Sequence, residues 1–199
     1  MSVSLRCYST SLGCPKNRVD TERLLGSLGV ALVPVESPDE AELVFINTCA
    51  FIQPATEESV RTIAQAIADI EELPKRPLLA VAGCLVGRYH AEDLAPELPE
   101  VDLWLDNSDL EAWPAMLARK LGLPEPTVPG RILSTGPSYA WLKISDGCRH
   151  ACSFCAIPNI RGGHRSHCKD MIVREARALL DQGVKELNPK RGVRDDTKR

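Results

Sequence analysis

The stretch Leu43-Val-Phe-Ile-Asn-Thr-Cys49 decides the fold that this chain is expected to adopt. Its first four residues are all apolar, without the alternation of a strand that has one face in water. Such a run is typical of a strand buried on both faces of a parallel sheet. A sheet of this kind needs helices on both faces, so the stretch predicts an α/β protein.

The neighbouring segments repeat this pattern in both directions along the chain. Strands are predicted over residues 3–10, 30–35, 78–82 and 101–105. Helices are predicted over residues 17–28, with Asn17 as cap, 54–73, 89–98, and from a cap at Ser108 or Asp109 to Leu121. This alternation predicts an open parallel sheet with helices on both faces, over residues 1–122.

A second, shorter unit is expected after a break in composition. Residues 123–137 contain several prolines and glycines, which indicates an interdomain linker. A strand over 139–144, a cysteine-containing loop, a helix over 171–180 and a short apolar segment at Val184 occupy residues 138–188. The charged tail 189–199 begins with Pro189, and we expect no buried parallel strand there.

Composition excludes several classes of protein. Of 199 residues, 44% are hydrophobic and 26% are charged, as in ordinary globular proteins. The formal net charge of −3 and the aromatic fraction of 5% argue against a broad basic surface or a base-stacking platform for nucleic acid. No signal peptide and no membrane-spanning apolar run is apparent, so a cytoplasmic location is expected. In that compartment the eight cysteines indicate metal binding or catalysis rather than disulfides.

Three of these cysteines form a compact C-x3-C-x2-C motif: Cys148, Cys152 and Cys155. Soft thiolates select zinc, copper(I) or iron–sulfur clusters. Structural zinc sites commonly use two Cys-x-x-Cys hooks, and no second hook follows. In a 4Fe–4S cluster, three cysteines leave one iron open for another ligand. A zinc loop and a chance group of thiols remain the alternatives.

Three further cysteines, Cys14, Cys49 and Cys84, recur at intervals of 35 residues, and each follows a predicted strand. In open parallel sheets, ligands bind at the carboxyl ends of the strands. The fold is therefore expected to bring these thiols to one edge of the sheet. The alternative is three ordinary core thiols, and we assign Cys7 and Cys168 to that class.

Several motifs resemble the radical S-adenosylmethionine (SAM) methylthiotransferases over about Ser4 to Asn188. They are Ser11-Leu-Gly-Cys-Pro-Lys-Asn17, Asn47-Thr-Cys-Ala-Phe-Ile52, Gly83-Cys-Leu85, and Cys148–Cys155 with Ile157-Pro158 and Ile160-Arg-Gly162. They look most like the members that modify an aspartate of a small-subunit ribosomal protein. The tRNA-modifying members typically have Gly-Cys-Gln-Met-Asn where this chain has Gly13-Cys-Pro-Lys-Asn17.

The resemblance implies a cofactor set and a reaction. An N-terminal methylthiotransferase domain would precede the first βα unit of a radical-SAM partial TIM barrel. Cys14, Cys49 and Cys84 would hold an auxiliary 4Fe–4S cluster, and Cys148, Cys152 and Cys155 a second one that binds SAM, with Phe154 as the neighbouring aromatic. One SAM would methylate sulfur. Another would yield the 5′-deoxyadenosyl radical that removes hydrogen from the aspartate β-carbon, which then takes the methylthio group.

The same resemblance implies partners and raises a doubt about activity. The partners are a small-subunit ribosomal protein or the ribosome, and an electron donor such as flavodoxin or ferredoxin. Most of the barrel and the family's C-terminal RNA-binding domain are expected to be missing. The chain is therefore predicted to be a truncated member that is inactive alone and unlikely to bind nucleic acid directly. A non-enzymatic iron–sulfur-binding fragment and a tRNA-modifying enzyme are the alternatives.

Basic residues surround the C-x3-C-x2-C loop, and Asp146 is the only acidic residue among them in the sequence. They are Lys143, Arg149, His150, Arg161, His164, Arg165, His167 and Lys169. Such a field could attract an acidic protein or RNA, or offset the charge of a thiolate-bound cluster. A solvated loop without function is the alternative.

Overall fold

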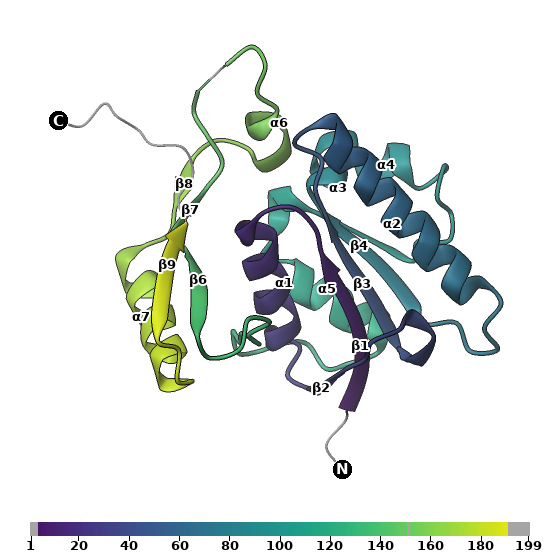
Figure 1. Cartoon of the computed structure of the whole chain (residues 1–199), viewed down its shortest axis with the longest axis horizontal. Helices are drawn as coiled ribbons and strands as arrows, with labels where there is room; N and C mark the ends of the chain where they lie inside the picture. The colour runs from purple at the N-terminus through teal and green to yellow at the C-terminus, as the bar shows by residue number, and fades with distance from the viewer. Residues whose placement is uncertain (1–3, 151, 191–199) are drawn as a thin grey trace.

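The structure is a computed structural model that describes residues 4–150 and 152–190. Its centre is a five-stranded parallel sheet with the strand order β2-β1-β3-β4-β5 (Figure 1). The strands are β1 (Ser4–Ser11), β2 (Ala31–Pro34), β3 (Leu43–Thr48), β4 (Leu78–Gly83) and β5 (Leu103–Asp106). All six residues of β3 are buried, because this strand is central and covered on both faces. The predicted α/β fold is confirmed.

Helices cover both faces of the sheet. The helices α1 (Pro15–Ser27) and α5 (Trp113–Leu121) pack Leu24 and Leu117 against Phe45 on one face. The helices α2 (Gln53–Glu71) and α3 (Cys84–Tyr89) close a second core on the other face, around Ile46 and Val81. Shorter elements complete this unit: η1 (Pro38–Glu40), α4 (Ala91–Leu94) and η2 (Asn107–Asp109).

Three helix starts differ from the prediction. The helix α1 begins at Pro15 with Cys14 as N-cap, so Asn17 lies inside the helix; proline suits the first helical position because it needs no N–H donor there. The helix expected from residue 89 begins five residues earlier, at Cys84, and is interrupted at His90, whose φ is +60°. The helix α5 begins only at Trp113, because residues 107–109 form a separate 3₁₀ turn.

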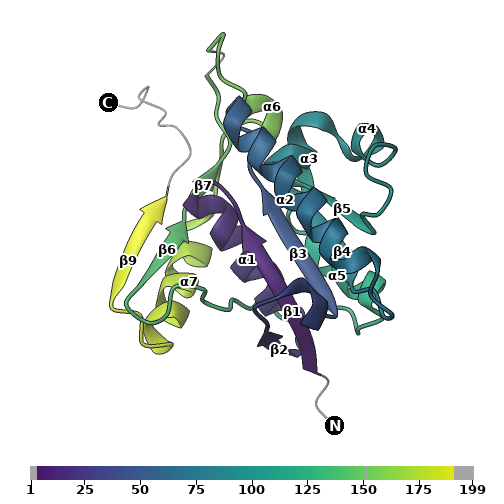
Figure 2. The ribbon, with the colours of Figure 1, turned by 45° about the vertical axis from the view of Figure 1, so that its right-hand side comes forward.

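The second unit packs beside α1, as Figures 1 and 2 both show. It contains β6 (Tyr139–Lys143), α7 (Lys169–Asp181) and β9 (Glu186–Lys190), with a small core of Ala140, Leu142, Leu179 and Val184. Between β6 and α7 the chain forms β7 (Ser145–Asp146), α6 (Ile157–Arg161) and β8 (Arg165–Ser166), and β7 pairs antiparallel with β8.

A parallel strand does form around Pro189, but it is not the buried strand that the expectation excluded, because none of its residues is buried. Residues 186–190 form β9, which pairs parallel with β6 and places Pro189 opposite Leu142. The Ile144 N–H donates to the Lys190 carbonyl at 2.9 Å, so Lys190 turns its backbone toward β6. Because neighbouring residues in a strand turn their backbone groups to opposite sides, the missing N–H of Pro189 falls on the outer side of β9. The remaining tail, 191–199, lies outside the described residues.

The proline- and glycine-rich segment 123–137 is anchored along helix α1. A Cβ atom at Gly26 would lie 2.4 Å from the backbone nitrogen of Arg131, so only glycine permits this approach. Arg131 donates to Glu22 at 2.7 and 2.9 Å, and the Ser134 N–H donates to the same carboxylate at 2.9 Å. This segment therefore holds the second unit against α1, while the domain boundaries stay a prediction.

Candidate metal-binding site

Three turns bring cysteines to the carboxyl edge of the sheet. Cys14 follows β1 and caps α1, Cys49 directly follows β3, and Cys84 follows β4 as the first residue of α3. The strands β1 and β3 are the pair at which the strand order reverses, where open α/β sheets bind their ligands. Cys14 is the N-cap of α1, Cys49 lies four residues before α2, and Cys84 is the first residue of α3.

Two buried side chains hold these turns together. Asn17 Nδ2 donates to the carbonyls of Leu12 and Thr48, both at 2.8 Å, and so joins the turn after β1 to the end of β3. Thr48 Oγ1 donates to the Ala82 carbonyl at 2.6 Å and accepts the Leu85 N–H at 3.1 Å, which joins β3 to the turn that carries Cys84.

The backbone of Cys49 is held separately, by Ser59 on α2. The Cys49 N–H donates to Ser59 Oγ at 3.0 Å, and the same hydroxyl donates to the Cys49 carbonyl at 2.7 Å. The reasoning from sequence missed Ser59 and the bridging roles of Asn17 and Thr48. Asn17 and Thr48 stand within the quoted motifs, but Ser59 carries no sequence signal.

The Cys49 and Cys84 thiols form a hydrogen bond with each other. Because Cys84 donates this bond, the pKa of Cys49 is lowered to about 6, although burial acts in the opposite direction. The pKa of Cys84 is raised by the same bond and by burial. The charge of Cys14 also acts on Cys49, so the three thiols form one electrostatic group. Cys7 is different, because burial alone raises its pKa to about 12.

Two glycines leave space around these thiols. A Cβ atom at Gly13, whose φ is +80°, would lie 2.7 Å from Cys49 Sγ. A Cβ atom at Gly83, whose φ is +100°, would lie 2.2 Å from Asn47 Oδ1. Across residues 4–150 and 152–190, no three His, Cys, Asp or Glu side chains form a finished metal-binding geometry. The soft thiol donors nevertheless fit a thiolate-bound cluster.

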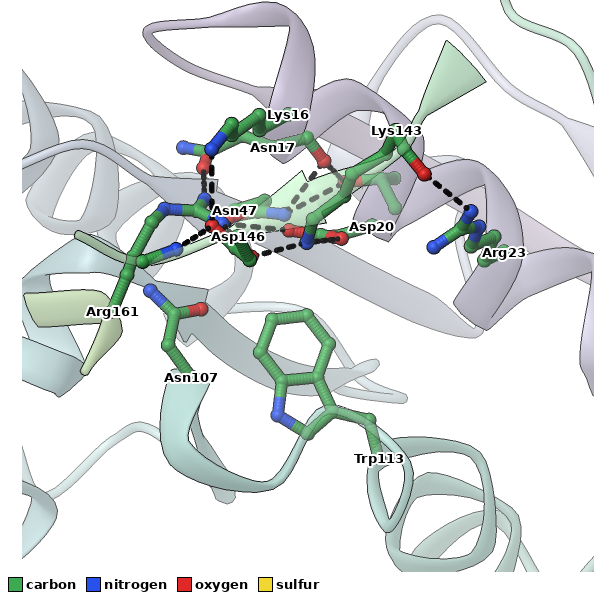
Figure 3. Close-up of polar contacts among 12 residues, drawn as sticks. Lys16, Asn17, Asp20, Arg23, Asn47, Asn107, Trp113, Lys143, Asp146 and Arg161 are labelled. Atoms are coloured by element: carbon green, nitrogen blue, oxygen red, sulfur yellow. Dashed lines mark hydrogen bonds and ion pairs between the residues drawn. The ribbon is translucent and has the colours of Figure 1, made fainter. Parts of the chain in front are cut away.

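Charged side chains beside the thiols form a buried network, shown in Figure 3. Lys143 Nζ lies 2.6 Å from Asp20 and 2.5 Å from Asp146. Arg161 Nη1 lies 2.8 Å from Asp146 and 3.3 Å from Asp20. Burial would raise the pKa of Asp146, but Arg161, Lys143 and Lys16 hold it well below its usual range. The network joins α1 of the first unit to β6, β7 and α6 of the second.

The basic field predicted around the loop is partly neutralised. Asp20, contributed by α1, opposes Lys143 and Arg161, so Asp146 is not the only acidic partner. Lys143 and Arg161 are buried, and their charges are paired with Asp20 and Asp146. Arg149, His150, Arg165 and Lys169 are exposed, and His164 and His167 are half-buried.

The C-x3-C-x2-C loop is more open than the first thiol group. Cys148 is buried, and its N–H donates to the Gly162 carbonyl at 3.1 Å. Cys152 is exposed, Cys155 is half-buried, and Phe154 is 91% exposed. The structure does not gather these three thiols into a finished site. Their role as ligands, and that of Phe154 beside a cofactor, stay predictions.

A hollow of about 490 Å³ lies between the start of the second unit and the edge of the sheet. It is lined by residues of α3, η2, α6 and β8, among them His90, Asp106, Arg161, His164 and Arg165. Basic side chains outnumber acidic ones in this lining, so the hollow suits an acidic group.

Comparison with known proteins supports the resemblance inferred from the motifs. Residues 6–106 match the family described as Uncharacterized protein family UPF0004. The chain is 71% identical over 180 residues to the ribosomal protein uS12 methylthiotransferase RimO of Nitratidesulfovibrio vulgaris strain DP4. It is 64% identical to the RimO of Oleidesulfovibrio alaskensis and 58% identical to that of Lawsonia intracellularis. These matches cover 90–94% of this chain and 42% of each relative.

None of the helices in the described part of the chain has the length and apolar character needed to cross a membrane. All eight cysteines are described, and all are free thiols.

Proposed function

The chain belongs to the family UPF0004, and from that premise we propose that it is the cluster-bearing part of a radical-SAM methylthiotransferase acting on ribosomal protein uS12. The relatives named for that activity are matched over 42% of their length, so the activity is proposed for the whole protein. The observation that carries the proposal is the group formed by Cys14, Cys49 and Cys84 at the switch point of the sheet.

In this proposal each thiol group holds one 4Fe–4S cluster. Cys14, Cys49 and Cys84 bind the auxiliary cluster, and Cys148, Cys152 and Cys155 bind the one that takes SAM, with Phe154 beside it. When bound, the clusters would carry the reducing electron and the sulfur, and SAM would supply the methyl group of the methylthio transfer to the aspartate β-carbon.

The residues of this chain prepare the first thiol group for metal. Cys84 donates its proton to Cys49 in a hydrogen bond, and this proton is released when both sulfurs bind metal as thiolates. Asn17, Thr48 and Ser59 hold the three turns, which limits the entropy lost when the sulfurs converge on one ligand.

The two thiol groups should differ in stability. Cys49 and Cys84 are buried, and Cys14 is exposed beside them. Cys152 is exposed on its loop, and solvent access makes a cluster more labile. We therefore expect the N-terminal group to retain iron longer than the C-terminal loop.

Partners and compartment follow from the same proposal. An acidic loop of the ribosomal target would suit the basic hollow lined by Arg165 and His164. A small electron carrier such as flavodoxin or ferredoxin would reduce the clusters. Free thiols and iron–sulfur chemistry are compatible with the reducing cytoplasm.

The test is anaerobic reconstitution with iron and sulfide, followed by gel filtration and measurement of iron per chain. Changing Cys14, Cys49 and Cys84 to alanine should remove the more stable share of iron. Changing Cys148, Cys152 and Cys155 to alanine should remove the more labile share. The matched control is Cys7→Ala with Cys168→Ala, which should leave iron unchanged.

Unchanged iron in the first triple variant would sink the proposed site. The chain could bind iron while the full-length protein, with SAM and reductant present, leaves the mass of the uS12 aspartate peptide unchanged. That result would instead favour a non-enzymatic iron–sulfur protein.

A further inference from the structure

Arg161 comes from the second unit but lies against the thiols of the first. It is the last residue of α6, which follows the C-x3-C-x2-C loop. A Cβ atom at Gly87 would lie 2.5 Å from the Ile160 carbonyl oxygen, so α6 packs directly on α3. The first residue of α3 is Cys84. The side chain of Arg161 is 96% buried at this junction (4% exposed).

The guanidinium reaches three acceptors with its two outer nitrogens. Nη1 pairs with Asp20 and Asp146, and Nη2 donates to Asn17 Oδ1. Asn17 Oδ1 lies 3.8 Å from Cys84 Sγ, and Arg161 also interacts with the Cys84 side chain directly, through a hydrogen bond and its charge. Only the planar fork of arginine meets these acceptors together, because a lysine has one nitrogen.

An amide oxygen next to a thiolate is unfavourable unless a cation balances it. Here the oxygen is Asn17 Oδ1. A metal-bound Cys84 would be deprotonated and would face the same oxygen as an anion. Arg161 already donates to that oxygen, so it offsets the repulsion in the metal-bound state. Asn107 Nδ2, 3.8 Å from Cys84 Sγ, adds a second donor.

The charges of the network do not balance without the thiols. Lys16, Lys143 and Arg161 are the cations, and Asp20 and Asp146 are the anions, which leaves one positive charge in excess. Buried charge needs a counter-charge close by. Arg161 interacts electrostatically with Cys84 and Cys14, and these sulfurs are suitably placed to supply it.

We propose that Arg161 is a positioning residue for the N-terminal thiol site, where its guanidinium holds Asn17 and supplies the positive charge that a thiolate-bound cluster requires. The inference rests on the proposed iron–sulfur function of Cys14, Cys49 and Cys84. It implies that the auxiliary site is completed only when the segment after the other cysteine loop is docked. A positive charge near a cluster also favours its reduced, more negative state.

The test compares variants in a background that carries Cys148→Ala, Cys152→Ala and Cys155→Ala, so that only the N-terminal site binds iron. The variants are Arg161→Met, Arg161→Lys and the control Arg177→Met, which removes an exposed arginine on α7. Iron and sulfide per chain are measured after anaerobic reconstitution, and a redox titration followed by electron paramagnetic resonance gives the reduced fraction.

Arg161→Met should lower the ratio of reduced to oxidised cluster at least tenfold at a fixed potential, which is about 59 mV for a one-electron couple. Arg161→Lys should recover part of this loss, and Arg177→Met should match the background. If the ratio of reduced to oxidised cluster in Arg161→Met equals that of the background, the inference is overturned while the proposed function stays intact. A background that binds no iron would overturn both.

A second variant covers the case in which Arg161→Met does not fold. Arg161→Met with Asp146→Asn removes one cation and one anion, so the excess of one positive charge is kept and Asp20 keeps Lys143 as its partner. Because the cation beside Asn17 is still missing, the ratio should again fall at least tenfold. If this double variant folds and its ratio of reduced to oxidised cluster equals that of the background, the inference is also overturned.

Discussion

Replacing Lys143 by methionine removes the lysine at the centre of the ion network while keeping much of the side-chain volume. Lys143 is 1% exposed and donates to Asp20 at 2.6 Å and to Asp146 at 2.5 Å. Hydrogen bonds to charged groups contribute about 1.5–3 kcal/mol each. Arg161 still pairs with both carboxylates, so the lower end applies, and we expect the free energy of unfolding to fall by about 3 kcal/mol.

Such a loss is large against a total stability of about 5–15 kcal/mol. For a chain of this size it corresponds to a decrease in Tm of roughly 6–12 °C. Urea and thermal unfolding followed by circular dichroism measure both quantities. The control is Lys75→Met, whose side chain is 86% exposed and whose effect should stay within about 0.5 kcal/mol.

A change below about 1 kcal/mol in Lys143→Met would refute this reasoning, because it would mean that the two carboxylates lose nothing when their shared lysine is removed. A double-mutant cycle with Asp20→Asn locates the effect. If the 2.6 Å contact is responsible, the two substitutions together should cost clearly less than the sum of the single ones.

Three further predictions follow from contacts elsewhere in the fold. The pKa values of Asp146 and Glu175 are lower in the folded chain than in the unfolded one. Their contribution to the free energy of unfolding is therefore complete above a pH of about 4 and is lost as the pH falls below it. Urea unfolding at pH 7, 5 and 3 should show this loss, which should be smaller in Asp146→Asn. Gly13→Ala should destabilise the chain more than Gly29→Ala and should also lower its iron content. Both glycines have positive φ, but only at Gly13 would the added Cβ clash with Cys49. Equal unfolding free energies and iron contents in the two variants would contradict this clash. Arg131→Met should cost about 3 kcal/mol and speed limited proteolysis within 123–137, because Glu22 loses its arginine and Glu175 keeps only Arg23; unchanged cleavage would show that the segment is held by other contacts.

Arg161 changes how the two cysteine groups are related. In the sequence they are separate motifs, and the resemblance assigns them separate cofactors. In the structure, the segment after the second motif contributes the cation beside the first. The two groups therefore depend on one interface, and a change that loosens it should affect the auxiliary site before any chemistry begins.

The strands and the strand-end positions of the cysteines were predictable from the sequence. Residues 43–46 are apolar without a break, and such a run is stable only between two helical layers. Once the strands are parallel, their carboxyl ends share one edge, so Cys14, Cys49 and Cys84 had to lie near each other. These inferences need only local periodicity and the rule that connects parallel strands.

Tertiary structure alone decided the ion network and the last strand. Asp20 pairs with Lys143 and Arg161 across sequence separations of 123 and 141 residues, and no local pattern encodes which distant charges will meet. Pro189 was expected to exclude a buried strand, and β9 forms as a partly exposed one because its pairing with β6 places the missing N–H on the outer side. Both outcomes depend on how the second unit docks against α1, since docking determines which charges lose water together and which strand edge is left unpaired.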